Sequence, residues 1–164
     1  MARVARAPAA KVAASWTASV LSGPNLDRLG TREPSIYGST TLPQIHARLA
    51  KVAAERGGEI VARQSNHEGQ LIDWLWAALD AGHCGVLLNP GAYTHTSYAL
   101  YDAIKGVGLD VVEIHLSNPE AREPFRSRSL VAPVCVGRVA GFGADSYELG
   151  LLALIKRVES RSRR

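Results

Sequence analysis

The fold is decided by the stretch GVLLNPGAYTHTSYALYDAIKGVGLDVVEIHLS, residues 85–117. Residues 85–88 form a short, wholly apolar run, as expected of a strand that is buried on both faces of a parallel sheet. Residues 96–107 have the pattern of a helix that stops at Gly108, and residues 109–114 have the pattern of a further strand. A strand, a helix and a second strand in this order indicate a right-handed parallel crossover.

The same alternation extends to both sides of this stretch. Further strands are predicted at 15–22, 59–64 and 132–136, and further helices at 42–56, at 68–81 and from an N-cap at Asp145 to about residue 158. About five parallel strands with helices between them predict a doubly wound α/β sheet in the flavodoxin-like order.

Composition and charge exclude several classes of protein. The net charge is +4 and the pI is about 9.3, but the basic residues gather near the two chain ends, Arg157 and Arg161 among them, where we expect them to be solvated. No basic stripe interleaved with aromatic residues lies between the ends, and no run approaches the ~18 apolar residues of a membrane helix. We therefore expect neither nucleic acid nor a membrane as a partner.

Cys84 and Cys135 lie in or beside apolar runs and are expected to be small buried hydrophobes. Because nothing points to an oxidising compartment, we expect a cytoplasmic protein. Residues 1–15 contain no acid and are rich in Ala and Arg, a composition with some features of an organelle transit peptide but without the core of a secretory signal. We expect a disordered extension there, followed by a single domain over residues 16–160.

Polar residues gather where the predicted strands end. Asn25 follows the first strand, residues 65–68 (SNHE) follow the second, Asn89 follows the third and residues 115–118 (HLSN) follow the fourth. In open α/β sheets, ligands bind outside the carboxyl ends of the strands. The sequence therefore predicts a site at this edge of the sheet.

His115 is the best candidate for acid or base chemistry. It follows Glu113 by two positions, and the alternation of a strand puts both side chains on one face. The carboxylate could then hold the imidazole for work as a general acid. A surface histidine beside an acid is the alternative that spacing alone leaves open.

Arg32 and Tyr37 lie in the Gly- and Pro-rich segment 30–38, which is predicted to be a long loop, and such loops are often lids. A tyrosine with a pKa near ~10 is ionised to only about one part in a thousand at pH 7. A neighbouring arginine favours the phenolate, so Arg32 could make Tyr37 a base. The alternative is that Tyr37 anchors the loop by packing its ring.

Arg122 and Arg126 lie four positions apart, so one helical turn would align them as a receptor for a carboxylate or as a lid; a solvated basic patch is the alternative. Weaker candidates for positioning a ligand, each of which could instead be a turn residue, are Asn25, Asn89, His95, Asp102 and Ser117.

Other chemistries lack their motifs. His67-Glu68 is not a zinc-protease site, because position 71 is Leu where the second His is needed. The sequence has no G-x-S-x-G elbow, no Walker A loop and no Cys/His cluster, so we expect neither a metal nor a nucleotide. A non-catalytic flavodoxin-like module that holds a nucleotide is the alternative from a different class.

Five separated blocks resemble, in order, the motifs of the type II 3-dehydroquinate dehydratases, over about residues 19–158. They are VLSGPNLDRLGTREPSIYG (20–38), RQSNHEG (63–69), LNPGAYTHTS (88–97), VEIHLSN (112–118) and AREPFR (121–126). The resemblance implies a flavodoxin-like lyase that converts 3-dehydroquinate to 3-dehydroshikimate without a cofactor, in the shikimate pathway of aromatic amino acid biosynthesis or in quinate breakdown. An inactive descendant of this family is a further alternative.

The resemblance also implies catalytic roles. Tyr37 would take the C2 proton of the substrate, with Arg32 lowering its pKa. His115, oriented by Glu113, would protonate the departing C1 hydroxyl. Asn25 would hold a water that stabilises the enolate formed between these steps.

Substrate binding and assembly are implied in the same way. The substrate would be bound by Asn89, His95, the Leu116 backbone, Ser117 and Arg126. Arg122 resembles a lid residue, and Asp102 resembles a residue that reaches into a neighbouring subunit's site in a dodecamer built from trimers. Two departures stand out, because Ser22 replaces the usual Asn and Tyr101 replaces a frequent Arg. We expect the first to change local hydrogen bonding and the second to affect a subunit contact.

Overall fold

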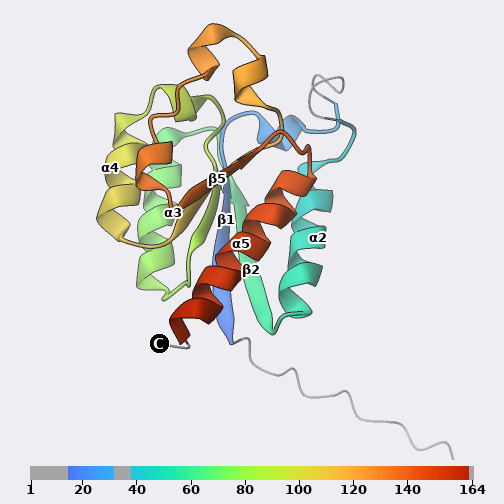
Figure 1. Ribbon diagram of the computed structural model, residues 1–164, viewed down its shortest axis with the longest axis vertical. Helices are drawn as coiled ribbons and strands as arrows, with labels where there is room; N and C mark the ends of the chain where they lie inside the picture. The colour runs from blue at the N-terminus through green and yellow to red at the C-terminus, as the bar shows by residue number, and fades with distance from the viewer. Residues whose placement is uncertain (1–14, 32–37, 163–164) are drawn as a thin grey trace, which may run out of the picture.

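The computed structural model describes residues 15–31 and 38–162, in which a five-stranded sheet lies between two layers of helices (Figure 1). The strands are β1 (Trp16–Ser22), β2 (Gly58–Gln64), β3 (Val86–Asn89), β4 (Val111–His115) and β5 (Gly137–Ala140). The main helices are α2 (Leu42–Ala54), α3 (Glu68–Asp80), α4 (Tyr98–Val107) and α5 (Asp145–Ser162). None of the helices in these residues is long and apolar enough to cross a membrane.

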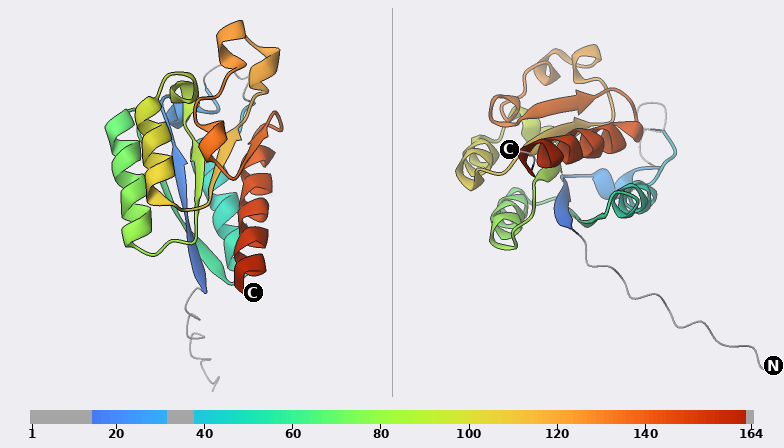
Figure 2. Two further views of the ribbon diagram at one scale, coloured as in Figure 1. Left: turned by 60° about the vertical axis from the view of Figure 1, so that its left-hand side comes forward. Right: turned by 60° about the horizontal axis from the view of Figure 1, so that its bottom comes forward.

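The strands lie in the order β2-β1-β3-β4-β5, and every neighbouring pair is parallel. Helices α3 and α4 cover one face of the sheet and α2 and α5 cover the other, as the two views of Figure 2 show. This is the flavodoxin-like order, so the predicted fold class is confirmed. The chain changes its direction of winding between β1 and β3, which is where such folds place their ligands.

Alternation along the strands divides the core into two halves. Ala18 and Val20 of β1 pack with α2 and α5, whereas Leu21 packs with α3 and α4. Residues 86–88 of β3 are completely buried, because helices cover both faces of the strand. This double burial explains why the run that decides the fold is apolar without alternation.

Local sequence sets the helix ends. The Thr41 hydroxyl accepts the N–H of Gln44 at 3.4 Å, and the Gln44 side chain accepts the N–H of Thr41 at 2.9 Å, which forms a capping box at the start of α2. Ser97 caps α4 by accepting the N–H of Leu100 at 2.8 Å. Gly108 ends α4 with a φ of 65°, a left-handed conformation that favours glycine. The helices predicted from periodicity are confirmed.

The strand predicted at 132–136 is wrong. Residues Ala132–Val134 form a 3-10 turn, and β5 follows it at Gly137–Ala140. Pro133 has no N–H to donate to a ladder, and the Ser129 hydroxyl accepts the N–H of Ala132 at 2.9 Å, which holds the chain in the turn. As an edge strand with only β4 beside it, β5 carries a weaker apolar signal than the central strands.

The final helix is longer than predicted, because α5 begins at Asp145, the predicted cap, and continues to Ser162. Its last turns are tied to the end of the sheet by Asp110, whose side chain is only 5% exposed. Arg157 Nε lies 3.0 Å from Asp110 Oδ2, and Arg161 Nη2 lies 2.9 Å from Oδ1. These two arginines are therefore helical and paired with Asp110, while their side chains stay 46% and 61% exposed to solvent, as the charge pattern predicts.

The two cysteines are free, half-buried and packed against the two halves of the core. Burial raises the pKa of the Cys84 thiol, and burial followed by the charge of Glu113 raises the pKa of Cys135 to about 12. Both thiols therefore behave as the small hydrophobes that the sequence predicts.

Candidate active site

A pocket lies at the carboxyl ends of β1, β3 and β4, at the edge of the sheet that the polar strand ends predict. Two 3-10 turns, Pro119–Ala121 and Pro124–Arg126, stand above this edge and are the orange segment in Figure 1. Of the residues predicted from the sequence, the pocket is lined by Asn25, Asn89, His95, His115, Leu116, Ser117, Arg122 and Arg126.

The loops after β1 and β3 pack closely against each other. The Gly23 N–H donates to the Asn89 carbonyl at 2.8 Å, and a Cβ on Gly23 would lie 2.7 Å from the Pro90 carbonyl oxygen. Only glycine permits so close an approach. The Gly91 N–H donates to Asn89 Oδ1 at 3.2 Å, which orients the Asn89 amide at the pocket wall.

A single residue, Asn66, ties three strand-end loops together. The N–H of Asn25, a residue in the left-handed region with a φ of 65°, donates to Asn66 Oδ1 at 2.8 Å. The same oxygen accepts from Gln64 Nε2 at 3.1 Å, and the Asn66 carbonyl accepts the Tyr93 hydroxyl at 2.9 Å. The position of Asn25 in the pocket is therefore set by the loop after β2.

His115 and Glu113 lie on the same face of β4, as their spacing predicts. Nε2 of His115 lies 2.6 Å from Oε1 of Glu113, and the Thr94 hydroxyl lies 3.4 Å from the same nitrogen. Glu113 is 0% exposed and His115 is 7% exposed, while the imidazole lines the pocket. A solvated surface histidine, the alternative left open by spacing, is therefore wrong.

The Glu113 carboxylate has two further partners from distant parts of the chain. The Ser129 hydroxyl lies 3.0 Å from both carboxylate oxygens. Arg138 Nε lies 3.7 Å from Oε1, because Glu113 and Arg138 are register partners on β4 and β5. A buried charge persists only when such partners compensate for the water it has lost.

Tyr147, near the start of α5, is completely buried, and its hydroxyl lies 2.9 Å from the Ser22 hydroxyl at the end of β1. Burial raises the pKa of Tyr147 to about 12, while side-chain hydrogen bonds from Ser22 and Asn89 act in the opposite direction. The phenol is therefore a neutral hydrogen-bond partner. Ser22, where the family motif usually has Asn, thus finds its partner on α5.

Arg122 and Arg126 make the end of the pocket under the two 3-10 turns basic. Their side chains are 15% and 21% exposed, which contradicts the alternative of a solvated patch. Arg122 Nη1 lies 3.5 Å from the Ser117 hydroxyl, and Arg126 Nε donates to Glu123 at 2.7 Å. The hydrogen bond from Arg126 is the main cause that lowers the pKa of Glu123.

Some predicted residues do not line this pocket. Arg32 and Tyr37 lie outside the described residues. Glu113 lies behind His115, and Asp102 is exposed on α4, away from the pocket lining. Within residues 15–31 and 38–162, no group of three or more His, Cys, Asp or Glu side chains is placed to hold a metal ion.

The sequence analysis gave no individual role to the residues that hold the site together, namely Asn66, Thr94, Ser129, Arg138 and Tyr147, although Asn66 stood among the polar strand ends. Asn66 and Thr94 stand within the quoted motif blocks, so their polar side chains next to candidate residues were a usable signal. Arg138 carried no such signal, because its contact with Glu113 depends on the register of a strand that was predicted in the wrong place.

The strand order and the pocket together define a flavodoxin-like α/β protein whose site lies where β1, β3 and β4 end, with a buried His–Glu pair behind it. The family model described as Dehydroquinase class II matches residues 16–155. The chain therefore belongs to the class II dehydroquinases, and the family resemblance drawn from its motifs is confirmed.

Relatives and solved structures agree with this assignment. A 3-dehydroquinate dehydratase of Azorhizobium caulinodans is 59% identical over 140 residues, which cover 85% of this chain and 94% of the relative. The crystal structure of a type II dehydroquinase from Butyrivibrio crossotus is similar with a TM-score of 0.84 at 38% identity, over 85% of this chain and 97% of that one. A type II dehydroquinase from Propionibacterium acnes gives a TM-score of 0.83 at 39% identity, over 88% and 99%.

Proposed function

We propose that the protein is an enzyme that dehydrates 3-dehydroquinate to 3-dehydroshikimate. The observation that carries the proposal is the 2.6 Å contact between buried Glu113 and His115, whose imidazole opens onto the pocket. Membership of the class II dehydroquinases and relatives named 3-dehydroquinate dehydratase support the same reaction. Removal of water next to a ketone needs a base, an acid and a way to hold the enolate between the two proton transfers.

His115 is the proposed acid. With Nε2 engaged by Glu113, Nδ1 is the ring nitrogen that would pass a proton to the departing C1 hydroxyl. A carboxylate in this position fixes the orientation of the imidazole, as in other His–carboxylate pairs. The low exposure of His115, 7%, strengthens this interaction.

Asn25 is the proposed support for the enolate, through a water molecule held by its side chain. Its backbone is fixed by the bond to Asn66 and it lines the same pocket as His115. A donor that is already aimed before the reaction costs no reorganisation when charge develops on the enolate oxygen.

Tyr37 is the proposed base for the C2 proton, and Arg32 is proposed to lower its pKa. Both residues lie outside the described residues, so the support is their position in the quoted motif block 20–38. A tyrosine needs about 4 kcal/mol of help to ionise near pH 7, and the charge of an adjacent arginine acts in that direction.

The substrate would be bound by the groups that line the rest of the pocket, which are Asn89, His95, the Leu116 backbone, Ser117 and Arg126. Arg126 would exchange its bond with Glu123 for the substrate carboxylate, with Arg122 closing over it as a lid. Asp102, exposed on α4, would complete the site of a neighbouring subunit in a cytoplasmic dodecamer built from trimers, without a cofactor.

The test is to mix the purified protein with 3-dehydroquinate and to follow the ultraviolet absorbance of the conjugated enone product. We expect His115→Ala and Tyr37→Phe each to lower kcat by about 100-fold or more, as loss of a general acid or base does. Tyr98→Phe is the matched control, because Tyr98 is 67% exposed on α4 and its hydroxyl has no proposed role. Product from the parent with full activity of Tyr37→Phe would contradict the base alone, whereas no product from a folded parent would contradict the reaction.

A further inference from the structure

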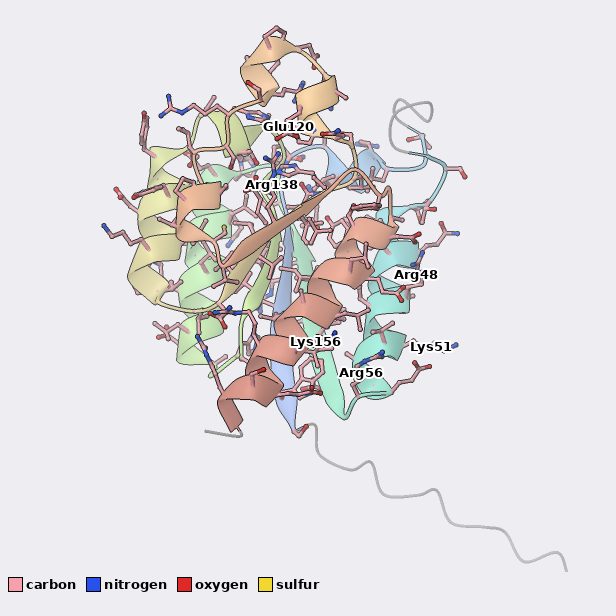
Figure 3. All side chains as sticks on the ribbon, viewed as in Figure 1. Arg48, Lys51, Arg56, Glu120, Arg138 and Lys156 are labelled. Atoms are coloured by element: carbon pink, nitrogen blue, oxygen red, sulfur yellow. The ribbon has the colours of Figure 1, made fainter. Side chains whose placement is uncertain are left out.

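Arg138 of β5 lies between two carboxylates that belong to different parts of the site. Its Nη1 donates to Glu120 Oε1 at 2.9 Å, and its Nε lies 3.7 Å from Glu113 Oε1. Glu113 is the partner of His115, whereas Glu120 lies in the turn Pro119–Ala121 that leads to Arg122. Figure 3 shows Arg138 and Glu120 together, between the end of the sheet and the turns above it.

The burial of Arg138 distinguishes it from a surface ion pair. Its side chain is 21% exposed, and Glu113 is 0% exposed. The Nε and Nη2 atoms of Arg138 are buried and have no hydrogen-bond partner among the described residues. Buried donors without partners are costly, so beside the Nη1 hydrogen bond to Glu120 the guanidinium is held by its charge, which faces the buried Glu113 carboxylate where water screens little.

Arg138 also differs from the other groups that face Glu113. Ser129 is neutral, and the charge of His115 depends on its protonation. An arginine keeps its charge throughout, because its guanidinium does not lose a proton in proteins. Arg138 therefore supplies a constant positive charge next to Glu113 while the proton of His115 comes and goes.

We propose that Arg138 is a positioning residue for the dehydration, whose fixed charge holds the Glu113 carboxylate directed at His115. The inference rests on the proposed function and adds a residue to it. The same guanidinium also donates to Glu120, which is 51% exposed in the turn that precedes Arg122.

Within residues 15–31 and 38–162, Arg138 does not line the pocket and contacts no group proposed to bind substrate. Its loss should therefore act on proton transfer by His115 more than on binding. In kinetic terms, kcat should fall while KM changes little, because an interaction used mainly in the transition state has been weakened.

The test compares Arg138→Met, which keeps the length without the charge, with Arg138→Lys, which keeps the charge. We expect Arg138→Met to lower kcat by about tenfold or more with KM within about threefold, and Arg138→Lys to recover most of kcat. Arg48→Met is the matched control, because Arg48 also bridges two acids, Asp145 at 2.8 Å and Glu148 at 2.7 Å, on helices away from the pocket. It should keep the kcat of the parent.

A second measurement does not depend on turnover. The melting temperatures of Arg138→Met, Glu113→Gln and the double variant form a double-mutant cycle. If the two residues interact, the melting temperature of the double variant falls by less than the sum of the falls in the two single variants. Non-additive losses in melting temperature support the Arg138–Glu113 interaction, whether or not the parent acts on 3-dehydroquinate. A parent that does not act on 3-dehydroquinate would contradict only the proposed function. Additive losses, an Arg138→Met variant with parental kcat, or equal kcat losses in the Met and Lys variants would overturn the proposal.

Discussion

At the scale of single residues, the hydrogen bond between Ser22 and Tyr147 joins the end of β1 to the start of α5 where water cannot reach. A side-chain hydrogen bond with Asn89 also lowers the pKa of this phenol, and Asn89 lines the pocket. The neutral phenol therefore supports two strand ends of the site from behind. A charge at this position would have no solvent to stabilise it.

Tyr147→Phe should change how the free energy of unfolding depends on pH, because it removes the buried phenol. The pKa of Tyr147 in the folded protein, about 12, lies above the ordinary value of 10.0, so the stabilising contribution of the neutral phenol is complete below pH 10 and is lost as the pH rises towards 12. We expect the free energy of unfolding of the parent to fall by ~1 kcal/mol more than that of Tyr147→Phe between pH 9 and pH 11.

Denaturant unfolding at a series of pH values measures this difference. The remaining tyrosines are common to both proteins, so their titration cancels in the comparison. Parallel pH curves for the parent and Tyr147→Phe would contradict the effect of burial on this phenol.

At the scale of elements, the turn Ala132–Val134 and the edge strand β5 explain how one face of β4 receives its polar partners. The turn brings Ser129 to the Glu113 carboxylate, and β5 brings Arg138 to its other side. Helix α5 is held at its far end by the bonds of Arg157 and Arg161 to Asp110.

Asp110→Asn should loosen the C-terminal turns of α5 without affecting the pocket. Asp110 is 5% exposed, but Arg157 and Arg161 are 46% and 61% exposed, so water screens much of the interaction. We expect a loss of about 1 kcal/mol in the free energy of unfolding, seen as a lower melting temperature and faster amide exchange near Arg157. Asp80→Asn, at an exposed position of α3, is the matched control. A parental exchange rate in α5 would contradict the anchoring role.

At the scale of the whole molecule, one subunit presents the pocket while Asp102 stands exposed on α4 outside it. If Asp102 serves the site of a neighbouring subunit, oligomers that contain both Asp102→Asn and Tyr37→Phe chains should behave differently from either variant alone. Asp102→Asn and Tyr37→Phe should each be poorly active alone, because each lacks one part of every site.

Co-assembly of the two variants should restore activity. In mixed rings, about a quarter of the sites would combine an intact Tyr37 from one chain with an intact Asp102 from the next. The turnover of co-expressed mixed oligomers, compared with that of the two variants mixed after assembly, measures this recovery. No recovery in mixed oligomers of the proposed size would contradict a shared site.

The sequence by itself determined the alternation of strands and helices, the edge where the site lies and the face shared by Glu113 and His115. Each of these follows from short-range periodicity, because a strand places residues two apart on one face and a helix repeats about every four residues. The family followed from the motif blocks, and eight of the predicted site residues do line one pocket: Asn25, Asn89, His95, His115, Leu116, Ser117, Arg122 and Arg126.

Only the tertiary structure decided which residues support that pocket. Ser22 and Tyr147 are 125 positions apart, and Asn25 and Asn66 are 41 apart. The contact of Glu113 with Arg138 depends on the register of an edge strand whose weak apolar pattern misled the prediction. Such contacts arise because parallel strands bring distant segments to one edge, and the side chains that meet there are chosen by register and packing, neither of which local periodicity encodes.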